Sequence, residues 1–252
     1  GGFSAIVQRL REPTHVGFAR LRVFVRLAHV SRAQLNTKTF EKLVWAIKEV
    51  APAVLLGVDD KHLKFLAPAD FDFVILLIQE NILAVIGQAY FASIKKAFTV
   101  FKLELHFSWF CSSLLEKRLQ GLRQLRDVVE MAAKRTSSFS QRNMERPFDL
   151  QFLLGWLEDR GFVDELFGPH LHVEVLKRAV TILRILAQNN RVERHHLHSL
   201  WLCAKGAHEA VQRVLYSVIT DLVPVLAPPH RHFLFERISS VSANEFDEPI
   251  LH

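Results

Sequence analysis

"HVEVLKRAVTILRILAQNN", residues 172–190, carries the pattern that decides the fold. Its apolar residues recur every three or four positions, which is the spacing of one face of an α-helix. The pair Asn189-Asn190 suits the end of such a helix. The apolar face comprises Val175, Leu176, Ala179, Ile182, Leu183 and Leu186, and the opposite face carries Glu174, Lys177, Thr181, Arg184 and Gln188. The stretch therefore predicts one amphipathic helix with a single buried face.

The same period extends in both directions along the chain. It predicts helices over 15–30, 38–52, 112–135, 147–161, 207–222 and directly after Pro228-Pro229. Glycine (10) and proline (9) are scarce among 252 residues, which disfavours a sandwich or barrel with many tight turns. Helices joined by short turns predict an all-α fold of stacked helix pairs, an armadillo- or HEAT-like superhelix.

Two segments depart from this period. In "FKLELHFSWF" (101–110) apolar and polar residues alternate, which is typical of a strand, and we interpret it as an extended connector or a misread helix. The polar, serine-containing segment 134–146 predicts a loop. We expect one helical domain over 1–252, and the missing initiator Met suggests a piece of a longer protein.

Charge and cysteine content narrow the classes of protein. The 32 basic and 26 acidic residues give +6, with both signs interspersed, whereas nucleic-acid domains concentrate basic charge on one face. Two cysteines without a signal peptide indicate a reducing compartment, so we expect a cytoplasmic location, with the nucleus left open. Gln79, Glu80 and Asn81 interrupt the most apolar run, 71–91, which favours a buried helix pair over a membrane span.

The stretch "HHLHSLWLCAKGAHEA" (195–210) raises the question of a metal site. On a helix turning roughly 100° per residue, His195 points away from the buried face, and His196 and His198 lie on opposite flanks. Three imidazoles arranged in this way cannot converge on one tetrahedral ion. We therefore expect these histidines to be exposed to water or to lie between helices, and we predict no metal-binding residue.

Motifs for other chemistry are incomplete or missing. His208-Glu209 begins a His-Glu-x-x-His signature, but Gln212 stands where the second zinc ligand is needed. No glycine-rich phosphate loop and no Gly-x-Ser-x-Gly turn occurs. The sequence predicts no catalytic residue and no cofactor. A basic cluster could contact an acidic partner or a nucleic acid, and consists of Arg9, Arg11, Arg20, Arg22, Arg26 and Arg32.

Several ordered blocks carry a family resemblance. They are "SSLLEKRLQGLRQL" (112–125), "LLGWLEDRGFVDELFG" (153–168), "LFGPHLHVEVLKR" (166–178), and "HLHSLW" (196–201) followed by "KGAHEA" (205–210). Together they resemble the armadillo-like, non-catalytic region of the giant ubiquitin carboxyl-terminal hydrolases of the fat-facets type, over about residues 106–240. The serine-rich segment 136–146 and the cluster His195–His198 depart from that family.

The resemblance implies a cysteine-type deubiquitinase activity elsewhere in the parent chain. Its Asn-Thr-Cys-Tyr box matches neither Cys111 nor Cys203, and neither Tyr90 nor Tyr216 follows a histidine, so no catalytic residue is carried over. We expect a scaffold that binds substrate proteins or its own protease domain, with no membrane partner. Three alternatives stay open: a HEAT-type adaptor unrelated to ubiquitin, a nucleic-acid binder, and a zinc enzyme built on His195, His196, His198 and His208.

Overall fold

The computed structural model describes residues 17–137, 148–205 and 207–241. Within these ranges the chain consists of helices and connecting turns, without a strand, which confirms the all-α prediction. No helix of the described part is both long and apolar enough for a membrane span. The chain divides into two compact units, residues 1–117 and 118–252, which are described separately. The prediction of a single domain over 1–252 stays a prediction.

The first unit is built on four long helices. Its elements are α2 (Phe18–Val30), α3 (Thr37–Leu56), α4 (Asp60–Leu63), α5 (Pro68–Ile86), the short 3₁₀ turn η2 (Gln88–Tyr90) and α6 (Phe91–Phe110). Helices α2, α3 and α5 pack against one another, and α6 packs against α3 and α5. The predicted helices 15–30 and 38–52 correspond to α2 and α3. Their apolar faces meet in a core that contains Leu21, Val25, Leu43, Ile47 and Ile78.

Side-chain caps define where the helices of this unit begin. Asn36 accepts a hydrogen bond from the backbone N–H of Thr39 at 2.9 Å and so caps α3. Asp59 caps α4 through the N–H of His62, also at 2.9 Å. Such caps satisfy N–H groups that the first helical turn leaves without a partner.

Of the two interpretations of 101–110, the misread helix is confirmed and the extended connector is wrong, because the segment is the second half of α6. A half-buried strand needs one face exposed to water, but Lys102, Glu104 and His106 are all partly buried, and Leu103 and Leu105 between them are buried. A helix with apolar neighbours on several sides can produce a short alternation by chance. Leu105 and Trp109, four positions apart, are both buried, as one face of a helix requires.

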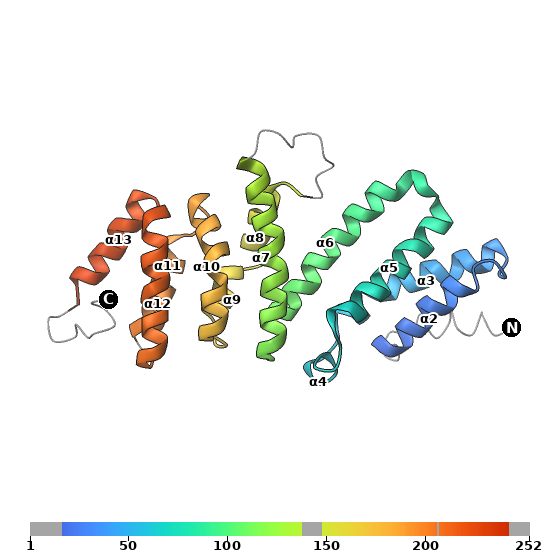
Figure 1. Cartoon of the computed structure of the whole chain (residues 1–252), viewed down its shortest axis with the longest axis horizontal. Coiled ribbons are helices and arrows are strands. Elements are labelled where there is room, and N and C mark those ends of the chain that lie inside the picture. The colour runs from blue at the N-terminus through green and yellow to red at the C-terminus, as the bar shows by residue number, and fades with distance from the viewer. Residues whose placement is uncertain (1–16, 138–147, 206, 242–252) are drawn as a thin grey trace. The chain divides into compact units, whose positions relative to one another are not determined.

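The second unit continues with shorter helices. Its elements are α7 (Leu115–Ser137, which begins at the end of the first unit), α8 (Leu150–Asp159), α9 (Phe162–Leu166), α10 (Val173–Gln188), α11 (Arg194–Lys205), α12 (Glu209–Leu222), the 3₁₀ turn η4 (Val223–Val225) and α13 (Pro228–Ser239). Helix α12 packs against α10 and α11, and α11 also packs against α13. Figure 1 shows α10 and α12 as neighbouring, upright helices. This pairing fits a helical solenoid.

The helix predicted from residues 172–190 is confirmed as α10, and every residue of its predicted apolar face is buried. Its end depends on Asn190, which adopts a left-handed backbone with φ 56°. This turn lets the N–H of Arg191 reach the carbonyl of Leu186 at 2.8 Å. The chain then passes directly into α11.

The predicted helix 147–161 corresponds to α8, and its last residue, Gly161, follows the helix. Gly161 has φ 65° and separates α8 from α9. The predicted loop 134–146 is wrong at its start, because α7 continues through Ser137. The remainder of that loop, 138–146, lies outside the described residues.

Candidate functional site

Two short segments of the second unit bring together three side chains of types that can ligate a metal ion. Asp164 belongs to α9, and His195 and His196 belong to the first turn of α11. Helix α9 is anchored by Phe162, Val163 and Leu166, which are buried. The ligand atoms of Asp164, His195 and His196 all lie within 4.8 Å of one another. The site therefore joins segments that are far apart in the sequence.

His196 forms part of the start of α11. Its Nδ1 accepts a hydrogen bond from the backbone N–H of Glu193 at 3.0 Å. Glutamate or glutamine at this third helical position makes the same bond in a capping box. Of the two positions expected for these histidines, exposed to water or between helices, His196 takes the second, because it is only 8% exposed. The His196 ring is buried because it lies beside Leu157, Phe162 and Leu186, with which it lines a small pocket.

Burial also sets the charge of the His196 ring. It lowers the pKa of His196, and the neighbouring His195 lowers it further, whereas the carboxylate of Asp164 acts in the opposite direction. The two imidazole rings lie next to each other, with centroids 3.9 Å apart and their planes tilted by 47°. A neutral His196 ring that accepts at Nδ1 carries its proton on Nε2.

His195 has different surroundings, because its side chain is 56% exposed. Its Nδ1 lies 3.2 Å from Oε2 of Glu193, and its Nε2 lies 3.9 Å from Oδ1 of Asp164. Nε2 of His196 lies 3.8 Å from the same oxygen. The Nε2 atoms of His195 and His196 therefore both face Oδ1 of Asp164.

Sequence reasoning missed this cluster for an identifiable reason. It compared only imidazoles on one helix and counted His195, His196 and His198 together. The structure leaves His198 outside the cluster, with its ring 6.5 Å from that of Phe233. The third ligand comes from Asp164, on another helix, and no sequence spacing indicates that distance.

Other histidines from the sequence analysis serve as helix caps. The Nδ1 atom of His208 accepts from the N–H of Ala210 at 3.4 Å and caps α12. His172 caps α10 in the same way, at 3.1 Å from the N–H of Glu174. These contacts account for the Nδ1 atoms without a ligand.

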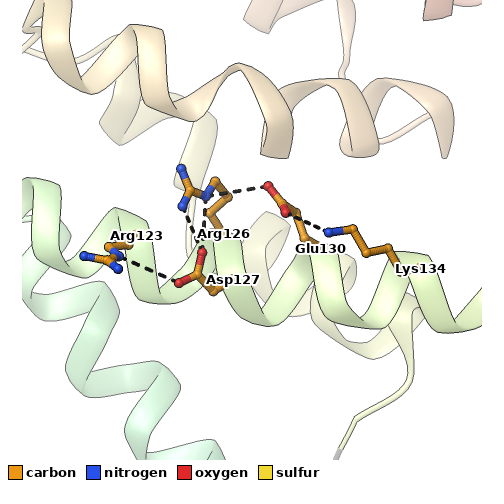
Figure 2. Close-up of polar contacts among 5 residues, drawn as sticks. All are labelled: Arg123, Arg126, Asp127, Glu130 and Lys134. Carbon is orange, nitrogen blue, oxygen red and sulfur yellow. Dashed lines mark hydrogen bonds and ion pairs between the residues drawn. The ribbon is translucent and has the colours of Figure 1, made fainter.

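A ladder of charges along α7 forms a second polar feature, and Figure 2 shows its five side chains. Asp127 lies 2.9 Å from Arg126 and 3.9 Å from Arg123, and Glu130 lies 3.6 Å from Arg126 and 3.4 Å from Lys134. Such exposed pairs along one helix contribute a few tenths of a kcal/mol each. The ladder stabilises and solvates one face of α7.

One residue of the N-terminal basic cluster, Arg22, makes contacts within the first unit. Arg22 forms an ion pair with Asp70 at 3.0 Å and lies over the ring of Phe73 at 5.7 Å. Arg9 and Arg11 lie outside the described residues. A nucleic-acid surface needs cations that are free to meet phosphates, so the pairing of Arg22 weakens that alternative.

The Cys203 thiol is poorly suited to nucleophilic chemistry. Burial raises its pKa, and its Sγ donates to the carbonyl oxygen of Phe167 at 3.5 Å. Catalytic cysteines require a lowered pKa, because the thiolate is the nucleophile.

Comparison with known proteins gives consistent matches. The family model described as the UBP24/USP9X/USP9Y ARM repeat matches residues 96–248. Human ubiquitin carboxyl-terminal hydrolase 34 is 30% identical over 133 residues, as is the mouse protein of that name. Ubiquitin carboxyl-terminal hydrolase puf of Drosophila melanogaster is 25% identical over 150 residues. No solved structure matches the chain.

These matches cover much of this chain and little of the relatives. They span 52% of the chain for the human and mouse proteins and 60% for the Drosophila protein, but 4% of each relative. The family model, in contrast, covers more than half of the chain and includes α7 to α13. The chain therefore belongs to the UBP24/USP9X/USP9Y ARM repeat family.

Proposed function

We propose that this chain is a non-catalytic helical scaffold of a large ubiquitin-specific protease, and that it binds protein partners. The relatives are named ubiquitin carboxyl-terminal hydrolases, and the region that matches the family model is an ARM repeat. In such a scaffold, the apolar stripe of each helix holds the array together and the outward faces are left for binding. The partners are substrate proteins or the protease domain of the parent chain.

The observation that carries this proposal is the outward stripe of α10, formed by Lys177, Thr181, Arg184 and Gln188. Lys177 is paired with Glu174 at 3.1 Å. Arg184 is exposed and has no hydrogen-bond or ion-pair partner within the ranges that the structure describes. An unpaired arginine keeps its five donors available for a carboxylate, so an acidic protein surface fits this stripe.

Site-specific photo-crosslinking tests the stripe. A benzoylphenylalanine at Gln188 places the probe on the stripe, and one at Asp159, exposed at the end of α8, provides the control. Irradiation in cell lysate, followed by mass spectrometry, should give discrete protein adducts from position 188 that are missing from position 159. Arg184→Glu should reduce these adducts at least tenfold, because it reverses the charge that an acidic partner meets. Identical adducts from both positions, or adducts indifferent to Arg184→Glu, would contradict the proposal.

A further inference from the structure

We propose that Asp164, His195 and His196 form a binding site for one transition-metal cation of the zinc type. Two imidazoles and one carboxylate are a donor set that zinc, nickel and copper accept, whereas magnesium and calcium prefer oxygen alone. The site is independent of the proposed scaffold function. It uses residues on α9 and α11 and none from the stripe of α10.

His195 is already arranged as a ligand. Oε2 of Glu193 lies 3.2 Å from its Nδ1, and a neutral ring that carries its proton on Nδ1 keeps the lone pair of Nε2 free for a metal ion. A carboxylate behind the ring in this way orients metal-bound histidines and makes them more basic. Nε2 of His195 faces Oδ1 of Asp164 at 3.9 Å.

The ligand atoms must move closer together to share one ion. Ligand atoms about 2.0–2.1 Å from a tetrahedral zinc ion lie roughly 3.4 Å from one another. The observed separations from Asp164 are 3.9 Å to His195 and 3.8 Å to His196, and all three ligand atoms lie within 4.8 Å of one another. The Asp164 side chain is 62% exposed and can move, and solvent can supply a fourth ligand.

His196 gives the site a distinctive signature. Its Nδ1 accepts the N–H of Glu193, so coordination through Nε2 transfers the ring proton to Nδ1 and breaks that hydrogen bond. Metal binding is therefore coupled to the cap of α11. We expect the Glu193 amide to lose protection from hydrogen exchange when the ion binds, while protection deeper in α11 is retained.

Titration of the whole chain with Zn²⁺ tests the site, with Co²⁺ as a spectroscopic probe and Mg²⁺ as a control ion. We expect one equivalent of Zn²⁺ by calorimetry, intense visible absorption with Co²⁺, and no binding of Mg²⁺. Asp164→Asn and His195→Ala should each weaken Zn²⁺ binding at least tenfold; both side chains are exposed, so the fold is retained. His198→Ala, on the same helix but outside the cluster, is the matched control and should bind as the original chain does.

Two results would overturn the site. One is the absence of stoichiometric Zn²⁺ binding by the folded chain. The other is binding that survives both Asp164→Asn and His195→Ala, or that His198→Ala reduces equally, because the ion would then be held elsewhere. Unchanged exchange at the Glu193 amide on binding would overturn the role of His196.

Discussion

The ring of His106 in α6 shows how burial changes a single side chain. It packs beside Trp109, with ring centroids 5.5 Å apart, and its Nδ1 has no hydrogen-bond partner in the part of the chain that the structure describes. The pKa of His106 is lowered from 6.5 to about 4, chiefly by burial; Asp72 opposes the shift and Lys102 adds to it. The folded state therefore favours the neutral form of the His106 ring.

This shift predicts a pH dependence of stability. Between pH 6.5 and pH 4 the unfolded chain binds a proton at His106 that the folded chain does not, so stability falls as the pH falls. The loss attributable to His106 between pH 7 and pH 5 should be about 2 kcal/mol. Urea denaturation at both pH values, compared with His106→Leu, measures it. Equal pH slopes for both proteins would show that the ring titrates normally.

At the scale of the element, Trp201 links α11 to α12. It is 7% exposed, and its ring centroid lies 6.1 Å from that of Tyr216. Trp201→Ala should reduce the free energy of unfolding by about 3–5 kcal/mol, because it removes a large buried side chain. The adjacent Leu202 is 54% exposed, so Leu202→Ala should change stability by about 0.5 kcal/mol or less. Chemical denaturation of both variants checks this, and a loss under about 1 kcal/mol for Trp201→Ala would contradict its place in the core.

Two glycines around α8 should respond in opposite directions. Gly161 has φ 65°, so Gly161→Ala should destabilise the chain by about 1–2 kcal/mol, although a Cβ there would have room. Gly155 lies inside α8, and a Cβ there would meet nothing within 4 Å, so Gly155→Ala should stabilise by up to about 1 kcal/mol. Thermal melts of the pair measure both signs. Destabilisation by Gly155→Ala would mean that this part of α8 is packed more closely.

Helical elements with one apolar face were predictable from the sequence, as α10 and α12 show. Their buried residues recur at helical spacing, and local signals such as Gly161 mark where a helix ends. Helix α6 was not predictable in this way, because partial burial of Lys102 and Glu104 removes the contrast between its faces. Hydrophobic periodicity predicts a helix only where one face is exposed to water and the other is buried, and the prediction fails where the two faces differ little.

The cluster of Asp164, His195 and His196 marks a different limit. A helical wheel gives directions around one helix, but it does not place α9 beside the first turn of α11. It also gives only the direction in which His196 leaves the helix axis, and it does not show that the ring, at the start of the helix, turns back to accept the N–H of Glu193. Contacts between elements require the packed structure, so the third ligand could not be predicted.

At the scale of the whole molecule, α-helices stack through their apolar faces, and we propose that they bind partners without catalysing a reaction. The family match supports this reading, since it identifies an ARM repeat among ubiquitin hydrolases. The burial of Cys203 agrees with it.

The most direct test is a hydrolysis assay with ubiquitin linked to aminomethylcoumarin, using the purified chain. We expect no release of the fluorophore above the buffer rate, for the original chain and for Cys111→Ser and Cys203→Ser alike. Turnover by the original chain that either serine variant abolishes would contradict a non-catalytic role, because the chain would then contain the nucleophile itself.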